Sequence, residues 1–348
     1  MTGTAPASAA AAWDDGEKGG QSHAEQSDDT GRRGQRPAVH RVRGHRRQPV
    51  IRIGINVPNF GPETDARALL SWARFAESHG FAAIVLSDHV APTREVAEIY
   101  PPPFYDPLTA IAWLAGQTQT LLLATSVLVV PYRHPLLTAR VSAMLHEISG
   151  ARFALGVGAG WAPTEFAALG ADYARRGQIT DQYLDVITTA WRQQRIDADL
   201  AGLSIAGVTT GPNPAGGSVP LWVGGSASPA IRRAVRFGTA WHPINPGRAW
   251  LAQTGRPALR RESERAGAPM PGIVPRIKFR PTTAPVADPD RPLGIGTIAQ
   301  ITGDIRFLAG LRAGLIILDP NPDTPRPRDY ACEQDGLLAV RAALTSHA

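Results

Sequence analysis

The segment GFAAIVLSDHV, Gly80–Val90, is a continuous run of apolar residues that stops at the polar pair Asp88-His89. Such a run, bounded by a glycine, is typical of a strand buried on both faces of a parallel sheet. An amphipathic helical pattern over Thr64–His79 precedes it. The segment therefore predicts a helix followed by a buried strand with an aspartate and a histidine at its carboxyl end.

The same alternation continues along the chain. Residues 196–219, rich in glycine and proline, are expected to be irregular. Eight segments have the character of buried strands: 50–57, 81–88, 121–130, 152–160, 220–226, 239–244, 273–280 and 314–319. Because eight parallel strands close a barrel, we expect an α/β fold, a (β/α)8 TIM barrel with insertions. A doubly wound open sheet is the competing architecture.

Polar and glycine residues recur at the carboxyl ends of these strands. In a barrel, all these ends meet on the one face that carries the active site, which favours the barrel over the open sheet. The residues at the strand ends are Asn59, Asp88-His89, Ser126, 158–161, 224–226 and Trp241-His242.

The Asp88-His89 pair could perform acid-base chemistry at this face. An imidazole with an ordinary pKa of ~6.5 exchanges protons near neutrality, and a neighbouring carboxylate could fix its tautomer. A histidine that only holds a loop is the alternative. A zinc or iron site would require further ligands, and only His242 is an obvious candidate, so we expect no metal.

Residues 223–234, VGGSASPAIRRA, predict an anion site. Two glycines follow a strand, Ser226 or Ser228 could cap the next helix, and Pro229 suits its first turn before Arg232 and Arg233. Free amides at such a helix start can bind a phosphate.

Residues 156–161, GVGAGW, resemble a dinucleotide fingerprint only in part. They lack the third glycine, and the APTEF segment that follows is expected to be non-helical. Glycines at a strand end still let a ligand approach the backbone closely.

The amino-acid composition indicates which classes of partner to expect. The chain of 348 residues is 43% hydrophobic and 19% charged, which is globular. Its net charge is +6, but acidic residues are interleaved with the arginines, so we expect no nucleic acid. The longest apolar stretches fall short of the ~20 residues that span a membrane, so none is expected. The single cysteine, Cys332, suits a reducing cytoplasm.

Residues 1–49 differ from the rest. They are rich in alanine, glycine and arginine and show no apolar periodicity, which predicts a disordered tail before a barrel domain at 50–348. They also lack the apolar core of a secretory signal. The abrupt change in composition predicts that native translation starts near Val50.

Several motifs together resemble the luciferase-like superfamily of flavin- and deazaflavin-dependent oxidoreductases, and in particular its actinobacterial branch that uses coenzyme F420. The resemblance runs from about residue 51 to 243 and implies a barrel that holds the deazaflavin on its C-terminal face without a metal. The motifs are VPNFG (57–61), GFAAIVLSDHV (80–90), YDPLTAIAWLAGQT (105–118), LLLATSVLVVPYRHPLLTAR (121–140), RFALGVGAGWAPTEFAALG (152–170), RRG (175–177) and PLWVGGSASPAIRRA (220–234).

The resemblance implies a role for individual residues. His89 matches the proton-transferring histidine, and Asp88 matches a cofactor contact. Ser126-Val127 matches a non-proline cis peptide bond behind the cofactor ring. The cofactor contacts implied besides Asp88 are Ser126, Val127, Val129, Ala159, Gly160, Thr164, Gly224, Gly225 and Ala227. We expect Trp161 and Trp241, both near strand ends, to line the substrate pocket.

The reaction implied is hydride transfer between F420 and a small alcohol, carbonyl, imine or activated alkene. Trp161 stands where sugar-phosphate dehydrogenase relatives have a glutamate, which favours a flatter or more apolar substrate. An FMN-dependent monooxygenase that uses oxygen is one alternative, and a non-catalytic deazaflavin carrier is another. The expected partners are a small-molecule substrate and, in a possible homodimer, a second copy of the chain.

Overall fold

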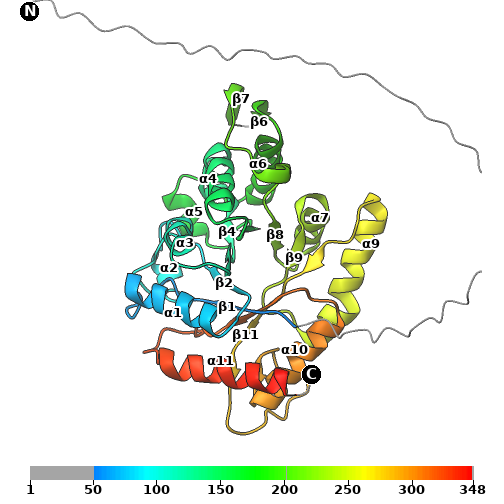
Figure 1. The fold of residues 1–348 in the computed structure, drawn as a ribbon. Coiled ribbons are helices and arrows are strands. Elements are labelled where there is room, and N and C mark those ends of the chain that lie inside the picture. The colour runs from blue at the N-terminus through cyan, green and yellow to red at the C-terminus, as the bar shows by residue number, and fades with distance from the viewer. Residues whose placement is uncertain (1–50, 201, 347–348) are drawn as a thin grey trace, which may run out of the picture. The chain divides into compact units, whose positions relative to one another are not determined.

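The computed structural model describes residues 51–200 and 202–346. The predictions for residues 1–49, a disordered tail and a native start near Val50, lie outside the described residues. Parallel strands lie at the centre of the described chain and helices surround them (Figure 1). The strands of the barrel are β1 (Ile53–Asn56), β2 (Ala83–Leu86), β3 (Leu122–Thr125), β5 (Phe153–Gly158), β8 (Leu221–Gly224), β9 (Ala240–His242), β10 (Gly272–Ile273), β11 (Arg276–Lys278) and β14 (Ile316–Asp319).

The strand order shows that the sheet closes. The hydrogen-bonded order is β10-β9-β8-β5-β3-β2-β1-β14-β11, and its pairings are parallel. Only residues 274 and 275 separate β10 from β11, and these two strands pair with β9 and β14 respectively. Counted as one strand, they join both ends of the sheet, so the described residues form the predicted eight-stranded (β/α)8 barrel.

Helices start where the sequence supplies capping residues. Asp65 and Asp106 each accept a hydrogen bond from the amide three residues later, at the starts of the first and third helices. The helices are α1 (Ala66–Ser78), α2 (Arg94–Ala97), α3 (Pro107–Ala115), α4 (Pro135–Ile148), α5 (Pro163–Ala168), α6 (Arg176–Arg192), α7 (Ser228–Phe237), α8 (Arg248–Trp250), α9 (Arg256–Ala266), α10 (Ile298–Gly310) and α11 (Tyr330–Thr345). Short strands β4 (Leu128–Val129), β12 (Arg280–Pro281) and β13 (Ile295–Gly296) complete this part.

Side chains alternate between two cores along each barrel strand. Along β2, Ala83 and Val85 belong to the cluster inside the barrel, whereas Ile84 and Leu86 pack in the larger cluster with the helices. Other strands contribute further alanines to the inner cluster, where they pack around the large side chain of Trp222.

Two regions differ from the expectations. Residues 196–219, expected to be irregular, contain an antiparallel hairpin of β6 (Arg195–Leu200) and β7 (Leu203–Thr209). The sequence analysis also does not predict α9, of which only Leu259 and Ser263 are buried. Few residues of either element are buried.

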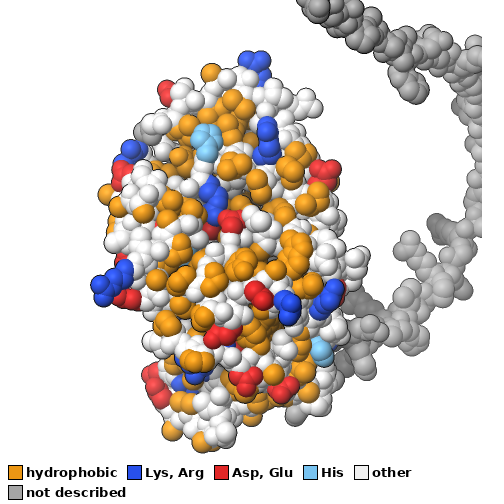
Figure 2. Space-filling model, turned by 90° about the vertical axis from the view of Figure 1, so that its left-hand side faces the viewer, with side chains coloured by type: hydrophobic (Ala, Val, Ile, Leu, Met, Phe, Trp, Pro, Cys, Tyr) orange, Lys and Arg blue, Asp and Glu red, His pale blue; other side chains and the backbone are white. Residues whose placement is uncertain are grey.

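The surface mixes side chains of every kind. Figure 2 shows one face on which apolar side chains are interspersed with arginines and carboxylates, without a continuous basic surface. Within the described residues, no helix is long and apolar enough to cross a membrane.

Candidate active site

A cavity of about 640 Å³ lies at the carboxyl ends of the barrel strands. It is also lined by Tyr100, Arg176 and Arg276, which the sequence analysis does not single out. The predicted site residues that line it are Asp88, His89, Ser126, Val127, Val129, Ala159, Gly160, Trp161, Gly224, Gly225 and Ala227. The barrel thus brings together predicted site residues up to 139 positions apart, from Asp88 to Ala227.

His89 is held by a carboxylate that comes from another strand–helix unit. Its Nδ1 lies 2.6 Å from Oε2 of Glu165, and both side chains are buried. The other carboxylate oxygen, Oε1, accepts hydrogen bonds from the amides of Val90 and Ala91. Because Nδ1 is engaged, Nε2 is the imidazole nitrogen left to exchange protons with a ligand.

Glu165, like Tyr100 and Arg276, is a candidate site residue that the sequence motifs did not single out. Residues 162–166, expected to be non-helical, start the short helix α5, whose first residue is Pro163. This expectation was wrong because Pro163 is well suited to the first turn of a helix. That proline, followed by TEFAAL, is the signal that could have placed Glu165 on a helix.

The pKa of Glu165 makes this contact dependent on pH. Burial alone would raise its pKa, but the hydrogen bond and charge of His89 and the two loop amides lower it below the usual 4.5. The folded state therefore binds fewer protons than the unfolded state in the acidic range.

We expect Glu165→Gln to lower stability most at neutral pH. The stabilisation from the carboxylate is fully present above the unfolded pKa of ~4.3 and is lost as the pH falls through the lower folded pKa. Urea unfolding of both proteins between pH 7 and acid measures the difference. A difference in free energy that stays constant down to the lowest pH would contradict this role.

Aromatic rings enclose the imidazole of His89. Its centroid lies 5.0 Å from that of Tyr100, 5.4 Å from that of Phe104 and 5.8 Å from that of Trp161. Trp161 lines the cavity and is 41% exposed, so it can form a wall against a ligand, as predicted.

The predicted cis peptide bond between Ser126 and Val127 is confirmed. The side chain of Val127 lies so close to two glycines that their replacement would meet it. A Cβ on Gly158 would lie 2.7 Å from Cγ2 of Val127, and one on Gly224 would lie 3.0 Å from its Cγ1. Val127 and these glycines therefore form a flat wall of the cavity.

Asp88 lines the cavity, but its carboxylate is engaged by the protein. Oδ2 accepts hydrogen bonds from the Val129 amide at 2.8 Å and from Arg133 at 2.7 Å, and Oδ1 accepts a second one from Arg133 at 2.8 Å. Its side chain is fully buried. The geometry supports a positioning role for Asp88, and a direct cofactor contact stays a prediction.

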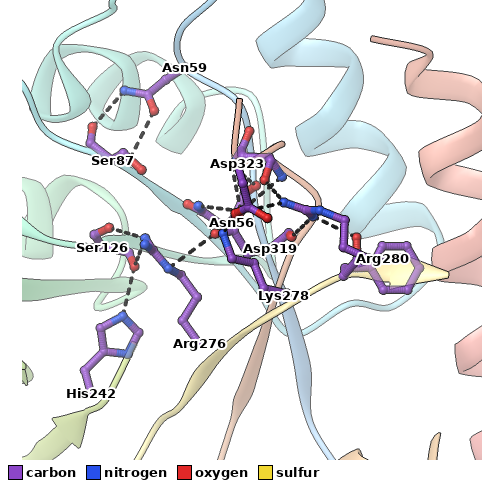
Figure 3. Close-up of polar contacts among 12 residues, drawn as sticks. Asn56, Asn59, Ser87, Ser126, His242, Arg276, Lys278, Arg280, Asp319 and Asp323 are labelled. Atoms are coloured by element: carbon purple, nitrogen blue, oxygen red, sulfur yellow. Dashed lines mark hydrogen bonds and ion pairs between the residues drawn. The ribbon is translucent and has the colours of Figure 1, made fainter. Parts of the chain in front are cut away.

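Asn59 fixes the end of β2 next to Asp88. Its side-chain amide donates to the carbonyl of Ser87 at 2.8 Å, and its oxygen accepts from the Ser87 amide at 3.0 Å (Figure 3). This strand-end asparagine, noted in the sequence, therefore orders the segment that carries His89.

The start of α7 forms one end of the cavity. Its N-cap is Ala227, whose side chain cannot cap the helix, so the expected cap by Ser226 or Ser228 is wrong. Arg176 and Arg233 line the cavity beside it. Pro229 has no amide hydrogen and the amide of Ala230 donates to the Ala227 carbonyl, so the Ser228 amide and two guanidinium groups are the donors that fit a phosphate.

Arg232, the other arginine of the predicted anion site, does not line this cavity. Its side chain lines a neighbouring hollow between α7 and α9. Arg233 is oriented by Asp181, whose Oδ1 accepts from its Nε at 2.6 Å.

We expect Gly225→Ala to damage this end of the cavity. Gly225 has φ +108°, which L-residues rarely adopt, and an added Cβ would lie 2.9 Å from that of Ala230. Strain of this kind costs about 1–3 kcal/mol. Urea unfolding should show a loss of that size together with weaker cofactor binding. Gly303→Ala in α10 is the control, because no described atom lies within 4 Å of its added Cβ.

His242 is neutral. Burial, aided by the charge of Arg276, lowers its pKa to about 3. Its Nδ1 lies 2.5 Å from the carbonyl of Val274, and its Nε2 lies 2.9 Å from Oγ of Ser126 (Figure 3). Both nitrogens are engaged, and the described residues contain no group of three or more metal-ligating side chains.

Two predicted residues lie outside the cavity. Trp241 does not line this cavity, because along β9 its side chain faces the helices and is fully buried beside Trp250. The alternation of strand side chains places its neighbour His242 inside instead. Thr164 is exposed on α5 and donates to Glu95 at 2.6 Å, away from the cavity lining.

Comparison with known proteins agrees with this architecture. An F420-dependent glucose-6-phosphate dehydrogenase of Beutenbergia cavernae is 31% identical over 220 residues, which cover 60% of this chain and 62% of that protein. A 4-hydroxyprotoasukamycin monooxygenase of Streptomyces nodosus subsp. asukaensis is 36% identical over 37% of this chain and 36% of that one. The chain spans less than two thirds of the length of these relatives.

Solved structures show the same fold. The monooxygenase RslO1 from Streptomyces bottropensis superposes with a TM-score of 0.70 at 19% identity, covering 85% of this chain and 99% of its own. An F420-dependent secondary alcohol dehydrogenase, solved with an F420-acetone adduct, gives 0.69 at 16% identity over 84% and 99%. The sequence model of the luciferase-like monooxygenase family matches residues 41–291. Since this match covers more than half of the chain, the protein belongs to the luciferase-like monooxygenase family.

Proposed function

We propose that this protein is an oxidoreductase that transfers hydride between coenzyme F420 and a small alcohol, carbonyl, imine or activated alkene. The observation that carries the proposal is that His89, held by the buried Glu165, lines the same cavity as the start of α7. A proton-exchanging group and an anion site in one cavity would suit a phosphate-bearing redox cofactor.

The residues of the cavity fit a flat cofactor with a phosphate. Gly158 and Gly224 let the side chain of Val127 pack against their backbone, because an added Cβ would lie 2.7 Å or 3.0 Å from its methyl groups. Arg176, Arg233 and the Ser228 amide of α7 suit the phosphate. A bound deazaflavin would supply the hydride chemistry.

His89 handles the proton in this proposal. With Glu165 ionised, its carboxylate accepts the Nδ1 hydrogen and leaves a lone pair on Nε2. Nε2 can then take the hydroxyl proton of an alcohol, or return it to a carbonyl oxygen in the reverse direction. The surrounding rings of Tyr100, Phe104 and Trp161 limit access of water to the imidazole.

Similarity to monooxygenases supports a second candidate, an FMN-dependent monooxygenase on the same barrel. RslO1 has this fold, and the monooxygenase of Streptomyces nodosus shares 36% identity over 134 residues. Both candidates need a flat cofactor with a phosphate, so they differ in the cofactor and in the need for oxygen.

The test is to titrate the purified full chain with F420 and with FMN, following cofactor fluorescence, and then to assay reduced-cofactor oxidation by cyclohexanone and cyclohexenone without oxygen. Tighter binding of F420 with anaerobic turnover supports the proposal. Binding of FMN alone, with turnover only in air, would replace it by the monooxygenase. Binding of F420 with no hydride transfer to or from any substrate of a broad panel would favour the carrier.

A further inference from the structure

Arg276 is a buried cation that lines the cavity and is only partly hydrogen-bonded. It lies on β11 and is 7% exposed. Its Nη1 donates to the carbonyl of Ser126 at 2.6 Å and contacts Oγ of Ser126 at 3.1 Å (Figure 3). Nε lies 3.6 Å from Oδ2 of Asp319 and has no hydrogen-bond partner, and Nη2 makes no hydrogen bond to any described residue.

Asp319 forms only a long ion pair with Arg276, at 3.6 Å. Oδ1 of Asp319 accepts hydrogen bonds from Asn56 and Asn321. Asp323 pairs with Lys278 and lies near Arg280, so three cations surround two carboxylates in this network (Figure 3). A buried donor without a partner is costly, and an excess of positive charge favours an anion.

A second polar group faces the same cavity. The hydroxyl of Tyr100 has no hydrogen bond to the described residues, and its ring packs beside His89. Burial raises the pKa of this hydroxyl above its usual value, although the charge of Arg276 acts in the opposite direction. The hydroxyl therefore remains a proton donor at neutral pH. Arg276 and Tyr100 thus offer donors within the cavity that holds the proton-exchanging imidazole.

We propose that Arg276 binds a carboxylate on the substrate, so that the preferred substrate is an organic acid bearing the reactive carbonyl or alcohol. A guanidinium suits this role because it is always charged and presents planar donors that match a carboxylate. The proposal rests on the proposed function for the reaction but concerns only binding. Arg276 is a specificity-determining residue, and His89 remains the group that moves the proton.

The test compares an acid with its neutral ester. Benzoylformate and methyl benzoylformate share the phenyl ring, which suits the wall formed by Trp161, and differ in the charge. Isothermal titration of the F420-loaded full chain should show benzoylformate binding at least about tenfold tighter, a difference of roughly 1.4 kcal/mol. Arg276→Gln should reduce this preference to less than about threefold, and Arg276→Lys should keep part of it.

Lys278→Gln is the matched control. It removes one positive charge from the same network, but Lys278 does not line the cavity, so the preference for the acid should remain. Thermal midpoints and F420 dissociation constants of all variants show whether the fold and the cofactor site are intact.

Three results would overturn the proposal. These are equal binding of acid and ester by the unchanged protein, failure of both benzoylformate and the smaller pyruvate to bind it, and a loss of F420 affinity in Arg276→Gln that matches the loss for benzoylformate. The last result would assign Arg276 to the cofactor.

If F420 itself does not bind, the proposed function fails, and the same titration of FMN-loaded protein still tests Arg276. If Arg276→Gln unfolds, the proposal is tested by the relative binding of benzoylformate and its methyl ester to the unchanged protein and to Arg276→Lys.

Discussion

His89→Asn is expected to lower hydride transfer by roughly 10²–10⁴-fold, the usual effect of removing a positioned acid-base group. Asparagine can still reach toward Glu165 but cannot exchange a proton near neutral pH. Because the imidazole is buried between aromatic rings, no water can readily replace it. Single-turnover hydride transfer, measured by cofactor absorbance, tests the rate, and cofactor titration should show nearly unchanged binding.

His146→Asn is the control. His146 is equally buried, and its Nδ1 lies 3.0 Å from the carbonyl of Phe153, away from the cavity lining. Its replacement should lower the thermal midpoint without a specific effect on the rate. Unchanged transfer in His89→Asn would mean that His89 only holds its loop. The carrier hypothesis would be favoured if neither the unchanged protein nor the variant transfers hydride.

Asp88→Ala is expected to destabilise the fold by about 3–5 kcal/mol, because it removes one partner of a buried ion pair. Arg133, whose side chain is only 12% exposed, would keep a single carboxylate, that of Asp106, 2.8 Å away. The amide of Val129 would also lose its acceptor. Urea unfolding at neutral pH measures this free energy.

Glu98→Ala gives the matched comparison. Its ion pair with Arg94 is exposed on both sides, so its loss should cost less than about 1 kcal/mol. A small loss of stability in Asp88→Ala, accompanied by much weaker cofactor binding, would restore the sequence-based interpretation of Asp88 as a direct cofactor contact.

The sequence was sufficient for the barrel and for most of the cavity lining. Most barrel strands are short apolar runs that are followed by polar or glycine residues. These are local features, so Asp88-His89, Ser126 and Gly224 could be placed on one face once the strand count suggested closure. The cis bond at Ser126-Val127 came from the family resemblance and was confirmed.

Only the tertiary structure decided which side chains meet. Glu165 lies 76 positions from His89, and Arg276 lies 150 from Ser126. Their contacts depend on how helix α5 and strand β11 pack across the barrel mouth. The sequence also did not show which way each strand side chain points. Trp241 and His242 are adjacent on β9, yet Trp241 is buried against the helices and His242 is buried inside the barrel. Strand side chains alternate between the two faces, so register, which packing sets, determines which of two neighbours reaches the site.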